Sequence, residues 1–352
     1  MPDGSGDDWP ALVDLDRLGA WMDGEGLAPG EITDVERLTG GTQNILLRFR
    51  RGGRSFVLRR PPPVSIAGGS RTMRREARLL HALRDTAVPH PRFIAACDGE
   101  DVLGAAFYLM DPVDGFNASV ALPRLHASDP AIRREMGFAM VDGALALGAV
   151  DPFVVGLEGF GKLDGFLERQ APRWLGQYES YTQFAGWSPD SLTGTQALAD
   201  WLDGNRPADF VPGIIHGDYH LANVMFRPDG PKLAAIVDWE LASLGDPLLD
   251  LGWLLATWYD PLDGDVETTV TPWDGFPDEA EMIARYRKGT MRDTTNLRWY
   301  KVLACYKLGI LLEGTHARAS AGKADVTIGQ RLHDQAVLLF ARAFRAIEDG
   351  TL

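Results

Sequence analysis

The stretch Ile214–Trp239 reads IIHGDYHLANVMFRPDGPKLAAIVDW, and it decides the fold more than any other part of the sequence. A His-Gly-Asp tripeptide ends at Asp218, and Asn223 follows five residues later. Two short apolar runs come next, separated by a Pro-Asp-Gly turn, and this pattern predicts two short strands. The second run ends at Asp238. Apart from the aspartate of the turn, this short segment supplies two carboxylates and one amide.

Phosphoryl transfer requires this set of side chains. One carboxylate must orient the attacking hydroxyl and accept its proton. Further oxygen donors must bind Mg²⁺, which prefers carboxylate, carbonyl or water ligands. Protein kinases place an aspartate and an asparagine in the catalytic loop and a magnesium-binding aspartate after the next strands. Each fragment alone is typical of a turn or a helix cap, but the spacing of all three favours a kinase.

The segment resembles the aminoglycoside phosphotransferase family and related choline-kinase-like enzymes. These proteins have HGD in the catalytic loop and end the metal-binding strand with Asp-Trp, as this sequence does. The resemblance implies that Asp218 is the catalytic base and that Asn223 and Asp238 bind Mg²⁺. It implies a structural role for His216, which would hold the loop through backbone hydrogen bonds. ATP or GTP would be the phosphate donor.

Two aspartates that follow the metal motif are predicted to be structural. Asp246 precedes Pro247, and a proline in the first turn of a helix after an aspartate indicates a helix cap. Asp250 lies one helical turn further on. We expect it to connect that helix to the catalytic loop.

The remaining pattern predicts an α+β, two-lobed protein-kinase-like fold. Residues 1–29 are expected to form a tail and a helix, 30–111 the nucleotide-binding lobe, and 112–352 the catalytic and acceptor-binding lobe. In the smaller lobe we expect an antiparallel sheet and one helix: strands at 31–38, 44–50, 54–60, 91–97 and 105–113, a breaker-rich loop at 61–70 and a helix at 71–85. From about residue 129 the pattern is mostly helical.

A kinase also needs a nucleotide site in the smaller lobe. Gly40, Gly41 and Thr42 fall between the first two strands, where glycine lets a backbone approach phosphate closely. A plain hairpin turn is the alternative for these residues. Residues 108–111 would connect the lobes, and the backbone at Met110 would pair with adenine. An ordinary buried strand is the alternative there.

Arg59 takes the position on the third strand at which kinases usually have a lysine. Residues 1–110 contain no lysine, so an arginine must perform any such role. Arginine keeps its charge and binds phosphate through two hydrogen bonds. Glu76 is the only acidic residue between Glu36 and Asp85, so we expect it to pair with Arg59. Arg60 points to the opposite face of the strand and is predicted to be solvated.

The charge of the chain excludes some partners. The 352 residues carry a formal net charge of −14, which argues against nucleic-acid binding. Residues 1–110 hold 14 Arg and 15 Asp+Glu, whereas the rest hold 21 basic and 34 acidic residues. The two cysteines permit no disulfide framework or zinc motif. Without an apolar run of roughly 18 residues or a signal-like start, we expect a cytoplasmic protein with no membrane partner.

Two stretches point to a subgroup. Residues 168–178 and 308–318 resemble the phosphotransferase domain that is fused to acyl-CoA dehydrogenases in larger proteins, and this implies a hydroxylated acyl-CoA as acceptor. We expect no dehydrogenase domain in the chain itself. The acidic larger lobe would instead suit a polycationic aminoglycoside. Basic clusters at 285–292 and 298–301 could offset that charge for CoA, or could simply be the polar faces of helices.

The sequence therefore predicts Mg²⁺-dependent phosphorylation of a small-molecule hydroxyl. A nucleotide-binding pseudokinase is the alternative, and the arginine at position 59 is the feature that favours it. A protein kinase is disfavoured because only residues 239–244 separate the metal motif from the next element. That segment is too short to recognise an extended peptide. The sequence leaves the oligomeric state open.

Overall fold

The computed structural model describes residues 9–38, 44–62, 66–263 and 270–350. The chain divides into two compact units. Unit 1 comprises Met1–Gly115, Val155–Leu157 and Ala234–Glu240, and unit 2 comprises Phe116–Val154, Glu158–Leu233 and Leu241–Leu352.

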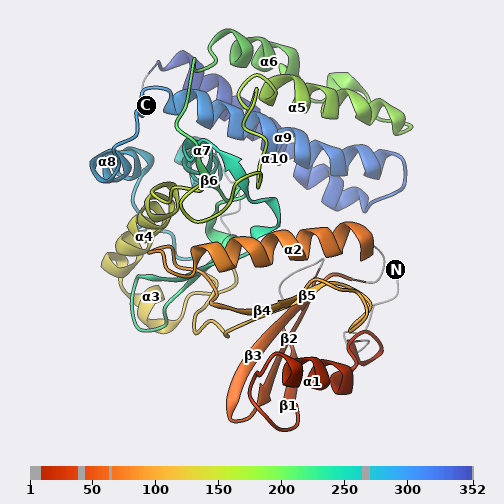
Figure 1. Cartoon of the computed structure of the whole chain (residues 1–352). Coiled ribbons are helices and arrows are strands. Elements are labelled where there is room, and N and C mark those ends of the chain that lie inside the picture. The colour runs from red at the N-terminus through yellow and green to blue at the C-terminus, as the bar shows by residue number, and fades with distance from the viewer. Residues whose placement is uncertain (1–8, 39–43, 63–65, 264–269, 351–352) are drawn as a thin grey trace. The chain divides into compact units, whose positions relative to one another are not determined.

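Unit 1 is built on a five-stranded antiparallel sheet with the strand order β1-β2-β3-β5-β4. The strands are β1 (Thr33–Arg37), β2 (Ile45–Arg51), β3 (Arg54–Arg60), β4 (Phe93–Cys97) and β5 (Phe107–Met110). A tight turn joins β2 to β3 at the paired residues Arg51 and Arg54, as the Arg-Gly-Gly-Arg sequence predicts. Helix α2 (Ile66–Leu83) runs along the sheet (Figure 1) and contacts β3, β4 and β5.

The two faces of β3 have different neighbours because successive side chains of a strand point in opposite directions. Leu58 belongs to a buried cluster that includes Leu18 and Met22 of α1 (Leu15–Gly24). Its neighbour Arg59 therefore points to the other face, where it meets α2. This alternation places a buried arginine beside α2.

Two expectations for unit 1 were wrong. Helix α2 begins at Ile66 rather than at residue 71, because Gly69 lies within the helix instead of breaking it. A Cβ at Gly69 would lie 2.3 Å from the Cβ of Pro61, so this glycine serves close packing. Arg60 is not solvated: it is 3% exposed, and its guanidinium donates to the backbone oxygen of Leu12.

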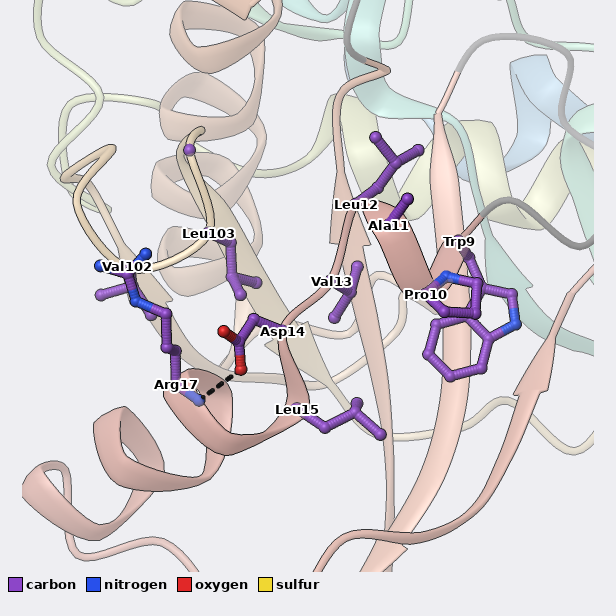
Figure 2. Close-up of a pocket in the computed structure, with 11 residues that line it drawn as sticks. Trp9, Pro10, Ala11, Leu12, Val13, Asp14, Leu15, Arg17, Val102 and Leu103 are labelled. Carbon is purple, nitrogen blue, oxygen red and sulfur yellow. Dashed lines mark hydrogen bonds between the residues drawn. The ribbon is translucent and has the colours of Figure 1, made fainter.

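Unit 1 also has a cavity of about 620 Å³, lined by residues 9–15, 17 and 102–104 (Figure 2). The backbone N–H of Arg17 donates to Asp14 at 3.0 Å, and the Arg17 guanidinium donates to the oxygen of Asp101 at 2.7 Å. None of the described residues that we assigned to the nucleotide lines this cavity.

Unit 2 is mostly helical. Its helices are α3 (Arg124–Ser128), α4 (Pro130–Gly148), α5 (Gln170–Glu179), α6 (Thr195–Gly204), α7 (Leu248–Thr257), α8 (Glu279–Gly289), α9 (Leu297–Ser320) and α10 (Val326–Glu348). Helix α9 packs against α5, α6, α7 and α10, and it lies side by side with α10 in Figure 1. Across the described ranges, no helix has both the length and the apolar character that a bilayer crossing requires.

The residues of the motif at Ile214–Trp239 lie on and around short strands. β6 (Gly213–Ile215) pairs antiparallel with β9 (Ser243–Gly245) in unit 2. β7 (Val224–Phe226) and β8 (Leu233–Ile236) form the hairpin expected around the Pro-Asp-Gly turn, and the chain enters unit 1 at Ala234. The loop after β6 and the end of β8 therefore deliver the two predicted aspartates.

Candidate functional site

The loop after β6, which carries Asp218, is held by Asp250, as predicted. The carboxylate of Asp250 accepts the backbone N–H groups of His216 at 2.6 Å and Gly217 at 2.8 Å. Asp250 lies in the first turn of α7 and is fully buried, and this burial raises its pKa to about 6. Asp246 accepts the backbone N–H of Leu248 at 3.0 Å, as a capping aspartate would, but α7 begins at Leu248 and Pro247 occupies the N-cap position rather than the first helical one.

Gly217 is a conformational requirement of this loop. Its φ is +85°, and a Cβ there would lie 2.7 Å from the backbone oxygen of Leu241. A side chain would therefore meet both backbone strain and a clash with the main chain. Glycine at position 217 therefore lets the backbone adopt this conformation immediately before Asp218.

The side chain of Asp218 is surrounded by donors. The Asn223 amide donates to the carboxylate of Asp218 and to its backbone oxygen, both at 2.9 Å, and His220 Nε2 lies 3.4 Å from the other carboxylate oxygen. Burial raises the pKa of Asp218, but the hydrogen bond from His220 and the electrostatic influence of His220, His216 and Lys307 outweigh it, so the pKa lies below its ordinary value. The group is an ionised acceptor at neutral pH, suited to orienting a hydroxyl.

Lys307 of α9 is a residue that the sequence reasoning missed. Its ammonium donates to the backbone oxygen of Gly217 at 3.0 Å and lies 4.2 Å from the ring centroid of Trp253 and 5.5 Å from that of Trp174. Burial lowers the pKa of Lys307 to about 8. One sequence signal was available: Lys307 is the only charged residue between positions 302 and 312. Such an isolated charge in an apolar helix needs a specific partner.

A pocket of about 360 Å³ opens beside Asp218 within unit 2. Its walls are mainly apolar and aromatic, and they include Trp253, Trp258, Tyr259, Trp273, Leu308 and Leu338. The rings of Trp258 and Trp273 meet edge to face, with centroids 4.9 Å apart. The pocket thus combines one ionised carboxylate at the catalytic loop with a large apolar surface.

Two other acidic residues of the pocket are neutralised by arginines of α10. Asp260 and Asp263 accept hydrogen bonds from Arg345 at 2.9 and 2.5 Å. Arg342 pairs with Asp263 as well and donates to three backbone oxygens at the end of α7. These carboxylates are already compensated, so they add little attraction for a cationic ligand.

In unit 1, Arg59 pairs with Glu76 as expected. Arg59 Nε lies 3.0 Å from Glu76 Oε2, and the Tyr108 hydroxyl donates to the same carboxylate at 2.7 Å. Arg59 Nη2 also donates to Asp238 at 2.9 Å. Burial raises the pKa of Glu76, whereas Arg59 and the Tyr108 hydrogen bond oppose that rise. The arginine therefore connects the helix carboxylate to the predicted metal ligand.

Asp238 adopts an unusual backbone conformation. Its φ is +64°, a left-handed region that residues other than glycine rarely adopt, and its side chain is 43% exposed. Strain of this kind is concentrated at functional sites, where the surrounding structure maintains it. Among the described residues, Ala28 and Asp34 also have positive φ, so the motif and the contact with Arg59 single out Asp238 rather than the conformation alone.

The structure brings Asp218 and Asn223 together in unit 2, and Arg59, Glu76 and Asp238 together in unit 1. Met110 is the buried last residue of β5, in register with Val57 of β3 and Phe93 of β4. The predicted turn residues Gly40, Gly41 and Thr42 lie outside the described residues.

The donor chemistry of the predicted metal ligands fits Mg²⁺. Asp238 offers a carboxylate, and the Asn223 amide nitrogen is directed to Asp218, which leaves the amide oxygen as the donor on the other side of the group. Both are hard oxygen ligands of the kind that Mg²⁺ requires.

The basic clusters of unit 2 are largely engaged in structure. Arg285 pairs with Asp142 at 2.7 Å, Lys301 pairs with Glu279 at 2.7 Å, and Arg292 donates to the backbone oxygen of Gly148 at 2.8 Å. These contacts favour the reading in which the charged residues belong to helix packing.

Comparison with known proteins identifies a matching family and several relatives. The model of a family described as "Phosphotransferase enzyme family" matches residues 34–292. Acyl-CoA dehydrogenase family member 11 of Gallus gallus is 28% identical over 306 residues, which cover 84% of this chain and 38% of that protein. In seven curated relatives, the match covers between 27% and 40% of the relative's length, so the chain spans well under half of these proteins.

Two solved structures extend the comparison. A Ralstonia eutropha JMP134 protein provisionally described as an aminoglycoside phosphotransferase is 30% identical, with a TM-score of 0.78 and coverage of 94% of this chain and 98% of that one. A thermostable mutant of aminoglycoside phosphotransferase APH(4)-Ia, solved with AMP-PNP and hygromycin B, shares the fold at a TM-score of 0.54 and 16% identity, with coverage of 92% and 97%. The predicted kinase-like fold is confirmed.

Proposed function

Because the chain belongs to the phosphotransferase enzyme family, we propose that it transfers the γ-phosphate of ATP or GTP to a hydroxyl of a small molecule. The observation that carries this proposal is the ionised Asp218, held by Asn223 and His220 at the edge of a pocket. A carboxylate in this setting can accept a hydrogen bond from the acceptor hydroxyl and align its oxygen for attack.

Different residues of the chain have different roles in the proposed transfer. Asp218 accepts the hydroxyl proton as the acceptor oxygen bonds to the γ-phosphorus and the bond from that phosphorus to the β,γ-bridging oxygen breaks, which releases ADP or GDP. Lys307 and Asp250 keep the loop in place through Gly217. Asn223 and Asp238 would hold Mg²⁺. When bound, Mg²⁺ neutralises the charge that develops on the phosphate oxygens.

For the nucleotide, we assign Arg59 to the phosphates, and Glu76 positions it. The guanidinium is buried and already oriented by two carboxylates, so little side-chain entropy is lost when it binds phosphate. We assign Gly40, Gly41 and Thr42, which the sequence predicts to form a turn, to the phosphates, and the backbone at Met110 to the base.

The pocket supports an acceptor with an apolar body. Its aromatic and leucine walls suit an acyl chain, and its two acidic residues besides Asp218 are paired with arginines. A polycationic aminoglycoside would find few uncompensated charges there. Together with the resemblance to domains fused to acyl-CoA dehydrogenases, this favours a hydroxyacyl-CoA as the acceptor class.

An ATP-consumption screen tests the proposal. The panel comprises hydroxyacyl-CoAs, free hydroxy acids, aminoglycosides, amino alcohols and sugars, each with Mg²⁺ and with ATP or GTP, and mass spectrometry identifies a phosphorylated product. We expect turnover with the hydroxyacyl group. Binding of ATP and Mg²⁺ without turnover on any acceptor would instead support the pseudokinase alternative.

A further inference from the structure

Three side chains that can bind metals lie together on α9 and α10 of unit 2. Glu313 and His316 are three residues apart on α9 and so share one face of the helix, and His333 projects from α10. Their ligand atoms all lie within 4.8 Å of one another. The imidazole rings of His316 and His333 stack with their centroids 4.5 Å apart. None of the three residues lines the pocket beside Asp218.

The carboxylate of Glu313 is the centre of this cluster. It is 0% exposed, and one oxygen accepts hydrogen bonds from Trp187 Nε1 and Ser191 Oγ, both at 2.7 Å. The other oxygen lies 2.7 Å from Nδ1 of His333. Trp187 and Ser191 are neutral donors, so they orient the carboxylate without cancelling its charge. A buried carboxylate of this kind requires a positive partner on its remaining side.

The two helices approach closely at this cluster. A Cβ at Gly329 of α10 would lie 2.5 Å from the Cβ of Ala319 and 3.4 Å from the Cα of His316. The missing side chain lets the backbone of α10 come near α9, and this brings His333 within reach of Glu313. A cation held here would connect the two helices directly.

We propose that Glu313, His316 and His333 bind a divalent transition-metal cation such as Zn²⁺. Two imidazole nitrogens and one carboxylate oxygen form a donor set typical of Zn²⁺, whereas Mg²⁺ prefers oxygen ligands alone. Three protein ligands leave one position for water. Zn²⁺ would be coordinated by one unprotonated nitrogen of each imidazole and would replace the hydrogen bond between His333 and Glu313.

The test uses the full chain without an affinity tag, first treated with EDTA. Calorimetric titration with ZnCl₂ is expected to give one equivalent bound, and the melting temperature rises because the cation binds only the folded state. Titration with Co²⁺, which absorbs visible light in such sites, reports the same ligands without any enzymatic assay. His316→Asn removes one ligand and leaves the Glu313–His333 contact in place, so affinity should fall at least about 10-fold.

The control is His81→Asn, which removes an exposed histidine of α2 and should leave the affinity unchanged. His316→Gln provides a second ligand variant if His316→Asn folds poorly. Absence of Zn²⁺ binding by the wild-type protein at micromolar concentrations would overturn the proposal. So would equal Zn²⁺ affinity in wild type and both His316 variants, because the cluster would then be only a buried ion pair.

Discussion

Asp218 is the residue on which the proposed chemistry depends, and its environment predicts the effect of removing its charge. Asp218→Asn keeps the size of the side chain but cannot accept the hydroxyl proton, so kcat should fall by about 10²- to 10⁴-fold. Because we assign the nucleotide to residues of unit 1, affinity for ATP should be unchanged by calorimetry. Asp229→Asn is the matched control, since Asp229 is an exposed partner of Arg227. Turnover at the wild-type rate would rule out Asp218 as the base.

Lys307 predicts a pH dependence. Its pKa is lowered to about 8, so the ammonium loses its proton as the pH rises through that value. The positive charge beside Asp218 and Asp250 then disappears. Arg173 is the cation that helps to lower the pKa of Lys307. We expect kcat/KM to decline above about pH 8. In Lys307→Arg the charge persists, because a guanidinium stays protonated, and the decline should be absent. An identical alkaline decline in both proteins would exclude Lys307 as its cause.

The contacts of Arg59 predict that lysine, which kinases usually have at this position, cannot replace it without a loss of affinity for ATP. The guanidinium contacts Glu76 and Asp238 at the same time, and a lysine ammonium cannot reproduce this planar arrangement. Arg59→Lys should therefore raise the KM for ATP by about 10-fold, corresponding to about 1.4 kcal/mol. Arg54→Lys, at a half-exposed pair with Asp111, is the control. An unchanged KM would mean that the two cations are interchangeable here.

At the scale of elements, the loop after β6 depends on a single glycine. Gly217→Ala places a Cβ 2.7 Å from the backbone oxygen of Leu241 at a φ of +85°. We expect a loss of about 1–3 kcal/mol in the free energy of unfolding, measured by urea denaturation. Gly204→Ala is the matched control, because Gly204 ends α6 and a Cβ there would meet open space. Equal stability of the two variants would contradict the strain argument.

Local sequence patterns predicted the elements of unit 1. Where a prediction was wrong, contacts between elements were the reason. The β2–β3 turn followed from two glycines between arginines, and the pairing of Arg59 with Glu76 followed from the scarcity of acidic residues. The early start of α2 could not be predicted, because Gly69 is tolerated only through its contact with Pro61. A contact of this kind has no signature in the local sequence.

At the scale of the whole molecule, the HGD motif predicted Asp218 and Asn223, because their spacing is local. The role of Asp250 was predicted from the separate Asp246-Pro247 pattern, although its contacts with the loop span 33 and 34 residues of sequence. Lys307 escaped prediction because it meets Gly217 across 90 residues of sequence. The contact between Glu313 and His333 is likewise made by neighbouring helices rather than by neighbouring positions. Contacts between elements that are far apart in the sequence therefore contribute residues that the motif does not predict.

The net charge of −14 leads to a prediction that separates the two acceptor classes. An acidic protein repels an anionic acyl-CoA and attracts a cationic aminoglycoside, and salt screens both effects. Raising the ionic strength from about 0.01 to about 0.1 M shortens the screening length from about 30 to about 10 Å. At saturating ATP, kcat/KM for a hydroxyacyl-CoA should therefore rise with salt, whereas for an aminoglycoside it should fall. A neutral sugar alcohol controls for effects of salt on the enzyme itself. If kcat/KM for the acyl-CoA falls instead, a local basic surface must recognise it, and the pocket beside Asp218 would supply only part of the acceptor site.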